Sequence, residues 1–338
     1  MRYALVLLVV LTSCNLFAQK IPFSTEKTIK GSVVIGDLII GGPSRLFVMD
    51  SLLLVQDVRN NGDKFLKVYN LEKGKLSREL GHKGRGPGEL MTPMINNVDM
   101  KSNRYYLRDN NLKKAHLYDI NNPSNPDSII NLDFLKNSLL LKSVYLNDSI
   151  LLGQGWFKDG LIATVNFKSK SVNYGVKFPF APFEGPSMNL GRANDGIIQL
   201  SPDKKHLIFA SMYFGYVGCY KIDGINLSKK WEKWLSKPKY KLDGKRIIYN
   251  TRENLMGVMD MTITNSKIYC IYSGAPMYLA RSMDAKNSPK TILCFSMEGV
   301  PLTKYHTDRP IIEIASDGKD GVYCLSKDPE YNVVRFKL

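Results

Sequence analysis

The sequence predicts an all-β protein: a six-bladed β-propeller with four-stranded antiparallel blades, in a ring closed by strands from both termini. Two observations lead to this prediction. Short β-branched and aromatic runs alternate with Asn, Asp, Gly and Lys clusters along the 338 residues, and helical periodicity is almost absent. A strand–turn–strand unit also recurs about six times, roughly every 40 to 60 residues, which is typical of propeller blades.

The predicted strands form six groups. The first group has four strands, and each later group has three that the sequence indicates directly. In chain order the strands are 44–50, 52–57, 64–69 and 75–80; 97–101, 105–109 and 114–120; 143–146, 149–153 and 161–167; 197–200, 206–210 and 217–222; 259–264, 267–272 and 291–297; and 312–316, 321–326 and 333–338.

Turn residues separate the first two strands of the units. Asp50-Ser51, Asn147-Asp148 and Ser201-Pro202-Asp203 each stand between two apolar strands, as a hairpin of two to four residues requires. The last group lacks a fourth strand before the C-terminus. We expect the segment 30–40, which precedes the first hairpin, to supply it, because this pairing removes two exposed strand edges.

A glycine-rich loop follows the strand at 75–80, with the sequence Gly81-His82-Lys83-Gly84-Arg85-Gly86-Pro87-Gly88-Glu89-Leu90. Its glycines and its proline exclude a helix or the interior of a strand. Two interpretations stay open. Successive backbone amides form an anion-binding nest with Arg85 and Lys83, or Arg85 pairs with Glu89 and fixes a joint between blades. A P-loop is excluded, because the Gly-Lys-Ser/Thr ending and the helix after it are missing.

The N-terminal segment, residues 1–18, has the pattern of a secretory signal. Arg2 precedes an apolar run at 4–11 that is too short to span a membrane. Leu11-Thr12-Ser13-Cys14 resembles a lipobox, with cleavage before Cys14 and lipidation of that residue; the alternative is signal-peptidase cleavage after Ala18. Residues 19–338 are predicted to form a single propeller domain. We therefore expect an exported protein, either an outer-membrane lipoprotein tethered through Cys14 or a periplasmic or extracellular protein.

The remaining four cysteines lie in apolar or aromatic runs, and we expect small buried core residues at Cys219, Cys270, Cys294 and Cys324. Disulfides are permitted in an envelope compartment, and the sequence does not choose among the pairings. The wide spacings and the lack of a Cys-x-x-Cys pair argue against a structural zinc site. The four histidines are scattered, so neither a metal nor a cofactor is predicted.

The net charge of +16 is the main oddity of the composition. Nucleic acid is the usual partner of so basic a chain, but an exported protein rarely meets it, so we predict no nucleic-acid binding. Anionic head groups and acidic polysaccharides are better placed, and the alternative is a basic surface without a partner. The densest basic run, Lys229 to Lys241, contains Trp231 and Trp234. It either contacts sugar rings or head groups, or forms a half-buried outer strand.

Loops from one face of a propeller converge on its central channel, so residues far apart in sequence can form one pocket. We predict Arg85, Trp156, Arg192 and Tyr213 for such a pocket. No catalytic residue is predicted. A Gly-x-Ser-x-Gly elbow is missing from the sequence, and a catalytic carboxylate pair is defined by distance in space, which sequence spacing does not give.

The chain resembles the six-bladed TolB-like or NHL-like propeller lipoproteins of Bacteroidetes-type bacteria. The resemblance rests on Leu11 to Cys14, on Gly84-Arg85-Gly86-Pro87-Gly88-Glu89 and on Ser201-Pro202-Asp203, and it covers nearly all of the mature chain. It implies a propeller fold and an envelope location, and no agreed activity. The chain departs from the family in one respect, since no acidic residues follow Cys14.

The leading functional hypothesis is a non-enzymatic cell-envelope binding or interaction module, a monomer whose partner is an envelope protein or an acidic glycan. One alternative is a hydrolase or lyase that acts on a saccharide or a lactone-like small molecule. Another is a scaffold subunit of an envelope complex. Carboxylates or histidines gathered in a deep channel mouth would favour the enzyme, and an aromatic-lined basic pocket would favour binding of an acidic glycan.

Overall fold

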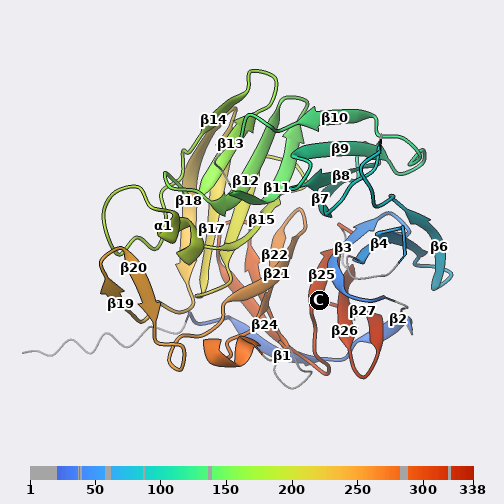
Figure 1. Cartoon of the computed structure of the whole chain (residues 1–338). Coiled ribbons are helices and arrows are strands. Elements are labelled where there is room, and N and C mark those ends of the chain that lie inside the picture. The colour runs from blue at the N-terminus through green and yellow to red at the C-terminus, as the bar shows by residue number, and fades with distance from the viewer. Residues whose placement is uncertain are drawn as a thin grey trace, which may run out of the picture.

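Six β-sheets are arranged around a central channel in the structure, a computed structural model (Figure 1). The structure describes residues 21–36, 38, 40–57, 62–86, 88–135, 139–281, 288–318 and 321–338. The predicted signal segment and Cys14 lie outside these residues. Within the described residues, no helix is long and apolar enough to cross a membrane.

The first four blades each contain four antiparallel strands in chain order, and the first strand of each blade lies beside the channel. Blade 1 holds β3 (Pro43–Met49), β4 (Leu52–Asp57), β5 (Leu66–Asn70) and β6 (Lys75–Leu80); blade 2 holds β7 (Pro93–Asp99), β8 (Arg104–Asp109), β9 (Lys114–Asp119) and β10 (Ser128–Asn131); blade 3 holds β11 (Leu139–Asn147), β12 (Ile150–Trp156), β13 (Ile162–Asn166) and β14 (Ser171–Asn173); blade 4 holds β15 (Gly196–Leu200), β16 (His206–Ser211), β17 (Tyr216–Asp223) and β18 (Asn226–Trp234).

The last two blades combine strands from both ends of the chain. Blade 5 holds β21 (Val258–Ile263), β22 (Lys267–Tyr272), β23 (Thr291–Ser296) and β24 (Pro301–Thr307), and blade 6 holds β25 (Glu313–Ser316), β26 (Gly321–Lys327), β27 (Tyr331–Lys337) and the N-terminal β2 (Ser32–Ile35). Strand β2 pairs antiparallel with β27, with Val33 opposite Val334. The predicted six-bladed fold and its closure by both termini are therefore confirmed.

A second N-terminal strand was not predicted. Strand β1 (Thr25–Ile29) pairs in parallel with β24 and makes blade 5 a five-stranded sheet. Phe23, just before it, packs edge-on against Phe295 with 5.3 Å between the ring centroids. The N-terminal strands β1 and β2 therefore pair with the outer edges of two neighbouring blades, 5 and 6.

Most predicted strands agree with the observed bounds to within a few residues, and the largest error lies in blade 2. Its inner strand was predicted at 97–101, whereas β7 begins at Pro93. The polar pair Asn96-Asn97 interrupts the apolar pattern there. In the structure these side chains accept hydrogen bonds from Ser143 N (3.3 Å) and Tyr145 N (2.9 Å) on β11. Two asparagines that look like a turn are thus part of the contact between blades 2 and 3.

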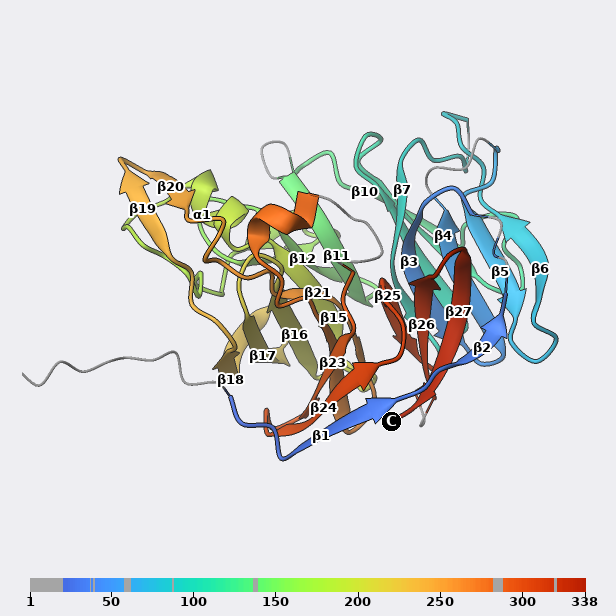
Figure 2. The same cartoon turned by 90° about the horizontal axis from the view of Figure 1, so that it is seen from below.

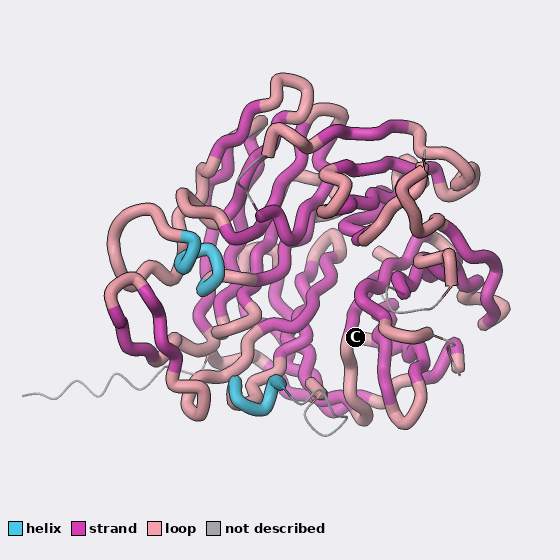
Figure 3. The backbone as a smooth tube through the Cα atoms, viewed as in Figure 1, coloured by secondary structure: helices cyan, strands magenta, loops and turns pink. Residues whose placement is uncertain are grey.

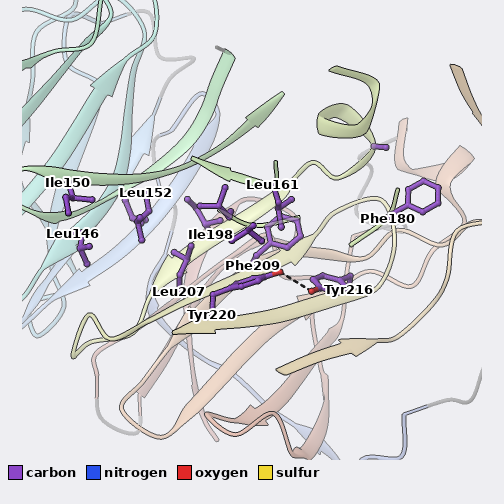
Figure 4. Close-up of a cluster of buried hydrophobic side chains, with 14 of the residues drawn as sticks. Leu146, Ile150, Leu152, Leu161, Phe180, Ile198, Leu207, Phe209, Tyr216 and Tyr220 are labelled. Atoms are coloured by element: carbon purple, nitrogen blue, oxygen red, sulfur yellow. Dashed lines mark hydrogen bonds between the residues drawn. The ribbon is translucent and has the colours of Figure 1, made fainter. Parts of the chain in front are cut away.

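Apolar side chains fill the space between neighbouring blades. Figure 4 shows the cluster between blades 3 and 4, in which Leu152, Phe209 and Tyr216 are almost fully buried. The hydroxyls of Tyr216 and Tyr220 lie 3.0 Å apart inside it. All four described cysteines are buried, as expected, and they are free thiols in the structure; burial raises the pKa of Cys219 to about 11.

Strand β18 contains the first residues of the basic run Lys229 to Lys241, including both of its tryptophans. The indole of Trp234 stacks on Phe214 at 5.5 Å, and Trp231 Nε1 donates to Met297 O of blade 5 at 2.9 Å. Both tryptophans therefore pack within the propeller, as the outer-strand interpretation requires. The run is not one strand, however, because β18 ends at Trp234 and the lysines beyond it enter a separate hairpin.

Buried polar side chains hydrogen-bond to the first strand of the following blade, or to the residues just before it. Every such joint from blade 1 to blade 6 has at least one bond. They are Gln56 Oε1 from Ile95 N (2.9 Å), Arg108 Nη1 to Leu140 O (2.7 Å), Gln154 Nε2 to Asn194 O (3.4 Å), Gln199 Nε2 to Met261 O (2.5 Å) and Asp260 Oδ2 from Ile314 N (2.8 Å). These bonds satisfy polar groups that would otherwise be buried at a cost in free energy.

The two faces of the ring differ. One face carries mostly short turns between strands. The other, which we call the loop-rich face, carries three long connections: 174–195 with α1 (Met188–Ala193), 235–257 with the hairpin β19 (Tyr240–Asp243) and β20 (Arg246–Tyr249), and 273–290 with η1 (Met277–Arg281). Figure 2 shows α1 and the hairpin on the same side of the ring, and Figure 3 shows the two helices in cyan. Long, elaborated loops of this kind commonly carry function.

Two asparagines hold these long connections by the same set of bonds. Asn194 Oδ1 accepts from Phe180 N, and its Nδ2 donates to Phe180 O and to Leu190 O. Asn254 Oδ1 accepts from Lys239 N, and its Nδ2 donates to Lys239 O and to Asn250 O. Both side chains are almost fully buried, so each bond is shielded from water.

We expect Asn254→Ala to loosen the connection 235–257 without unfolding the ring. The substitution removes three hydrogen bonds of 2.6–2.8 Å from a side chain whose residue is 2% exposed, at a cost of about 2 kcal/mol. Hydrogen–deuterium exchange should become faster in residues 237–250 and stay unchanged in blades 1 and 2. The control is Asn121→Ala in an exposed turn. Equal exchange in the two variants would contradict the assignment.

Candidate functional site

Each inner strand begins on the loop-rich face, so the first residues of these strands surround one mouth of the channel. Five charged residues gather there, from five different blades. We call them the mouth cluster: Arg45 on β3, Lys142 on β11, Asp195 just before β15, Asp260 on β21 and Glu313 on β25.

One ion pair of the cluster joins blades 3 and 4. Lys142 Nζ lies 3.1 Å from Asp195 Oδ1 and 3.8 Å from Met212 Sδ. Both charged side chains keep some solvent exposure, 17% for Lys142 and 14% for Asp195. Burial lowers the pKa of Lys142, and the carboxylate of Asp195 acts against that shift. The ammonium group is therefore neutralised by a partner and still accessible.

A second group joins blades 1, 5 and 6. Arg45 Nη1 lies 3.4 Å from Asp260 Oδ1, and Asp260 is hydrogen-bonded to Glu313. Burial raises the pKa of Glu313 well above its usual range, and the nearby Asp260 carboxylate adds to the shift. Burial raises the pKa of Asp260 as well, while Arg45 lowers it. Burial therefore favours the protonated form of Glu313, whose carboxyl is hydrogen-bonded to Asp260.

The two groups form one electrostatic unit. Besides burial and Asp195, the charges of Arg45 and Asp260 both act on the pKa of Lys142, the first lowering it and the second raising it. Glu313 Oε2 is shielded from water and has no hydrogen-bond partner among the described residues. A buried acceptor without a partner costs free energy, which a bound donor group would recover.

Three of the four predicted site residues lie at the rim beside this cluster. The guanidinium of Arg192 on α1 stands 4.7 Å from the ring centroid of Trp156, which ends β12. Helix α1 approaches so closely that a Cβ on Gly191 would lie 2.8 Å from Trp156 Cα. Tyr213 follows Met212, and burial and the charge of Asp195 raise the pKa of its hydroxyl. The role of these three residues in binding stays a prediction.

Arg85 lies apart from them, in the loop between β6 and β7. That loop is held by Lys83 N to Asp63 O (2.9 Å) and by Tyr118 Oη to Gly88 O (3.2 Å). Glu89 Oε2 accepts from Gly86 N at 2.7 Å, so the loop amide binds the chain's own carboxylate. Within the described residues, Arg85 and Glu89 form no ion pair, and Arg85 is exposed. A ligand role for Arg85 also stays a prediction.

The opposite end of the channel holds a cavity of about 420 Å³, lined by the last residues of the inner strands and by the short turns that follow them. Lys204 Nζ of blade 4 bonds to Asp99 Oδ2 of blade 2 at 2.7 Å. Met100 of blade 2 also reaches Gly318 of blade 6, where an added Cβ would lie 3.2 Å from Met100 Cε. Side chains from the turns thus cross this end of the channel.

The sequence prediction missed all five residues of the mouth cluster. A signal was present: Lys142, Asp260 and Glu313 each interrupt an apolar run near the start of a predicted inner strand, and Arg45 directly precedes such a run. A charged residue within a buried strand is costly unless an opposite charge or a hydrogen-bond partner lies nearby. Its recurrence near the start of four inner strands therefore indicates that these strand starts lie close together. Recognising it required the strand starts to be known more closely than the sequence defines them.

Comparison with known proteins identifies the family of the chain. A family model described as TolB-like 6-blade propeller-like matches residues 22–319. No curated protein matches the sequence.

Solved structures resemble the chain over most of its length. A putative exported protein from Bacteroides fragilis is 12% identical, with a TM-score of 0.56 over 92% of this chain and 98% of that one. A member of the duf4221 family from Bacteroides vulgatus is 11% identical, with a TM-score of 0.57 over 92% and 96%. The β-propeller domain of Cps50 (Swd1) from Myceliophteria thermophila is 8% identical, with a TM-score of 0.52 over 91% and 99%. At these identities the likeness shows the fold alone.

Proposed function

Since the chain belongs to the TolB-like six-bladed propeller family, we propose that it is a monomeric binding module of the cell envelope that takes an acidic carbohydrate at the loop-rich mouth of its channel. The observation that carries the proposal is the balance of charge there. Three cations, Arg45, Lys142 and Arg192, lie beside the carboxylates of Asp195 and Asp260, and burial shifts Glu313 toward its neutral form.

The chemistry of the rim suits a sugar acid. A ligand carboxylate would bind Lys142 and Arg45, both partly exposed. A sugar ring has apolar C–H faces, and Trp156 and Tyr213 offer aromatic surface beside the cations. A sugar hydroxyl would donate to Glu313 Oε2. The net charge of +16 would attract an acidic polymer from a distance.

An envelope location is part of the proposal. The N-terminal pattern at 1–18 supports export, and the similar Bacteroides fragilis protein is described as a putative exported protein. The lipobox-like Leu11 to Cys14 supports a lipid tether at Cys14. Mass spectrometry of the protein from membrane extracts tests this part directly. We expect a lipid-modified N-terminal peptide that begins at Cys14.

Calorimetric titration tests the binding proposal, with oligosaccharides of galacturonate, glucuronate and sialate and with their neutral counterparts. We expect at least one acidic oligosaccharide to bind about tenfold more tightly than its neutral counterpart. Lys142→Ala should weaken that binding at least tenfold, because a charge-assisted hydrogen bond contributes about 1.5–3 kcal/mol. Lys168→Ala, in an exposed turn between β13 and β14, is the matched control. Equal loss in both variants, or no preference for acidic sugars, would contradict the proposal.

A second candidate function is a hydrolase or lyase on a saccharide or lactone-like substrate. The observation that favours it is the Asp260–Glu313 pair, since one protonated and one ionised carboxyl are what general acid–base chemistry needs. We rank it second because the Asp260 side chain is only 4% exposed and already bonds Ile314 N and Arg45. Turnover of an acidic oligosaccharide that disappears in Asp260→Asn would make this function the leading one.

A further inference from the structure

The hairpin β19–β20 stands out from the propeller on the loop-rich face (Figures 1 and 2). Its four register pairs run from Tyr240 opposite Tyr249 to Asp243 opposite Arg246. Gly244 at its tip has φ +54°, and a Cβ there would meet no atom within 4 Å. The space beside Gly244 is therefore open, whereas the other turn residue, Lys245, lies next to Gly185 of the connection 174–195.

The hairpin is fixed at its base and also beside its tip. Tyr240 packs edge-on against Phe180 with 5.0 Å between the ring centroids, and Asn189 Nδ2 donates to Lys245 O at 2.8 Å. Ile247 and Tyr249 pack against the core cluster of blades 3 and 4. Leu242 is paired with Ile247, so it shares the packed face of the hairpin, whereas Ile248 is paired with Lys241 on the opposite face.

Exposed apolar side chains are concentrated on this hairpin and next to it. Tyr240, Leu242 and Ile248 are 40–44% exposed. Tyr278 on η1 is 51% exposed, and its backbone N–H donates to Thr251 O at the base of the hairpin. The other large apolar side chains that the described residues expose are separated along outer strands and turns: Val33, Leu76, Ile129, Ile225 and Val300.

Basic residues surround the same apolar side chains. The segment 237–249 carries a single acidic residue, Asp243, and five cations: Lys237, Lys239, Lys241, Lys245 and Arg246. Lys239 pairs with Glu253 at 2.6 Å. Across the described residues, the other four cations form no ion pair. Apolar and cationic groups thus alternate on one exposed projection.

We propose that this surface docks the protein onto a membrane that contains anionic lipids. The hairpin enters edge-on, so that Leu242 from one face, Ile248 from the other and Tyr278 of η1 reach the boundary between head groups and acyl chains. Lys241, Lys245 and Arg246 bind lipid phosphates. This combination identifies a lipid surface as the partner, because an acidic glycan offers no apolar layer for the aliphatic side chains. The inference is independent of what binds in the channel mouth.

Vesicle co-sedimentation tests the proposal with a chain that begins at Ile21 and retains every strand of the described ring. The probes are vesicles of phosphatidylcholine alone and of phosphatidylcholine with about 30% phosphatidylglycerol. We expect binding to the anionic vesicles only, weakened by salt. Lys241→Glu with Arg246→Glu should weaken it at least tenfold. Leu242→Ser with Ile248→Ser should weaken it about tenfold through lost apolar contact.

The matched control is Lys73→Glu with Lys75→Glu, which makes the same change in net charge on exposed cations at the edge of blade 1. It should change vesicle binding less than twofold. Equal losses in the two charge variants would overturn the proposal, since net charge alone would then explain binding. Binding that is insensitive to Leu242→Ser with Ile248→Ser, or no binding to anionic vesicles, would overturn it as well. Circular dichroism verifies that each variant is folded.

Discussion

Replacing Arg108 with Met is expected to lower the free energy of unfolding by about 3 kcal/mol. The Arg108 side chain lies on β8, its residue is 1% exposed, and it donates to Leu140 O (2.7 Å) and Leu141 O (2.5 Å) of the next blade. Burial lowers the pKa of the guanidinium to about 10, so it stays charged near neutral pH. Met fills similar volume but leaves both buried carbonyls without a donor.

Urea unfolding of wild type, Arg108→Met and Arg104→Met measures this effect. Arg104 lies on the same strand, but its side chain is 44% exposed and its partner is Asp127 at the surface. An exposed ion pair contributes about 1 kcal/mol or less, so the control should lose little stability. Similar losses of unfolding free energy in the two variants would mean that the hydrogen bonds from Arg108 to blade 3 contribute no more to stability than a surface ion pair.

Glu313→Gln is expected to make the protein more stable than wild type at pH 8, by about 1 kcal/mol or more. The folded-state pKa of Glu313 lies well above its usual value, chiefly because of burial. Between the unfolded and folded pKa values the folded state binds the extra proton, so wild-type stability falls as pH rises. Gln has no proton to lose, and its amide still donates to Asp260.

Unfolding free energies from pH 5 to pH 8 test the sign of this effect. The difference between Glu313→Gln and wild type should grow with pH and be smallest near pH 5. Glu298→Gln, with a side chain 69% exposed, should give a constant difference. A Glu313→Gln variant that is less stable than wild type at every pH would show that Glu313 is ionised in the folded protein.

The sequence indicated the blades because the signal for them is local. Each hairpin turn needs its own Asp, Asn, Ser or Gly between two apolar strands, so turns such as Ser201 to Asp203 are visible within about ten residues of chain. The missing fourth strand of the last blade was also found by this local count. Strand β1 was missed because its sequence, Thr-Glu-Lys-Thr-Ile, is mostly polar, and it becomes a strand only beside β24.

The long connections were missed for a related reason. Helix α1 has six residues, too few for helical periodicity to be visible, and Asn194 holds it through contacts with Phe180 and Leu190. The outer-strand interpretation of the basic run Lys229 to Lys241 joins β18 to the first residues of β19, and Pro238 is a weak local sign of the break between them. Strand β20 lies beyond that run and was not predicted.

The amino-acid sequence by itself determined the fold class, the number of blades, the closure of the ring and the burial of the cysteines, because each follows from patterns over a few neighbouring residues. Only the tertiary structure decided which face is elaborated and which charged groups meet. Arg45, Lys142 and Glu313 are far apart in the chain and adjacent in space because the ring brings the first residues of its inner strands to one mouth. Proximity across blades depends on the closed ring, and no local pattern encodes it.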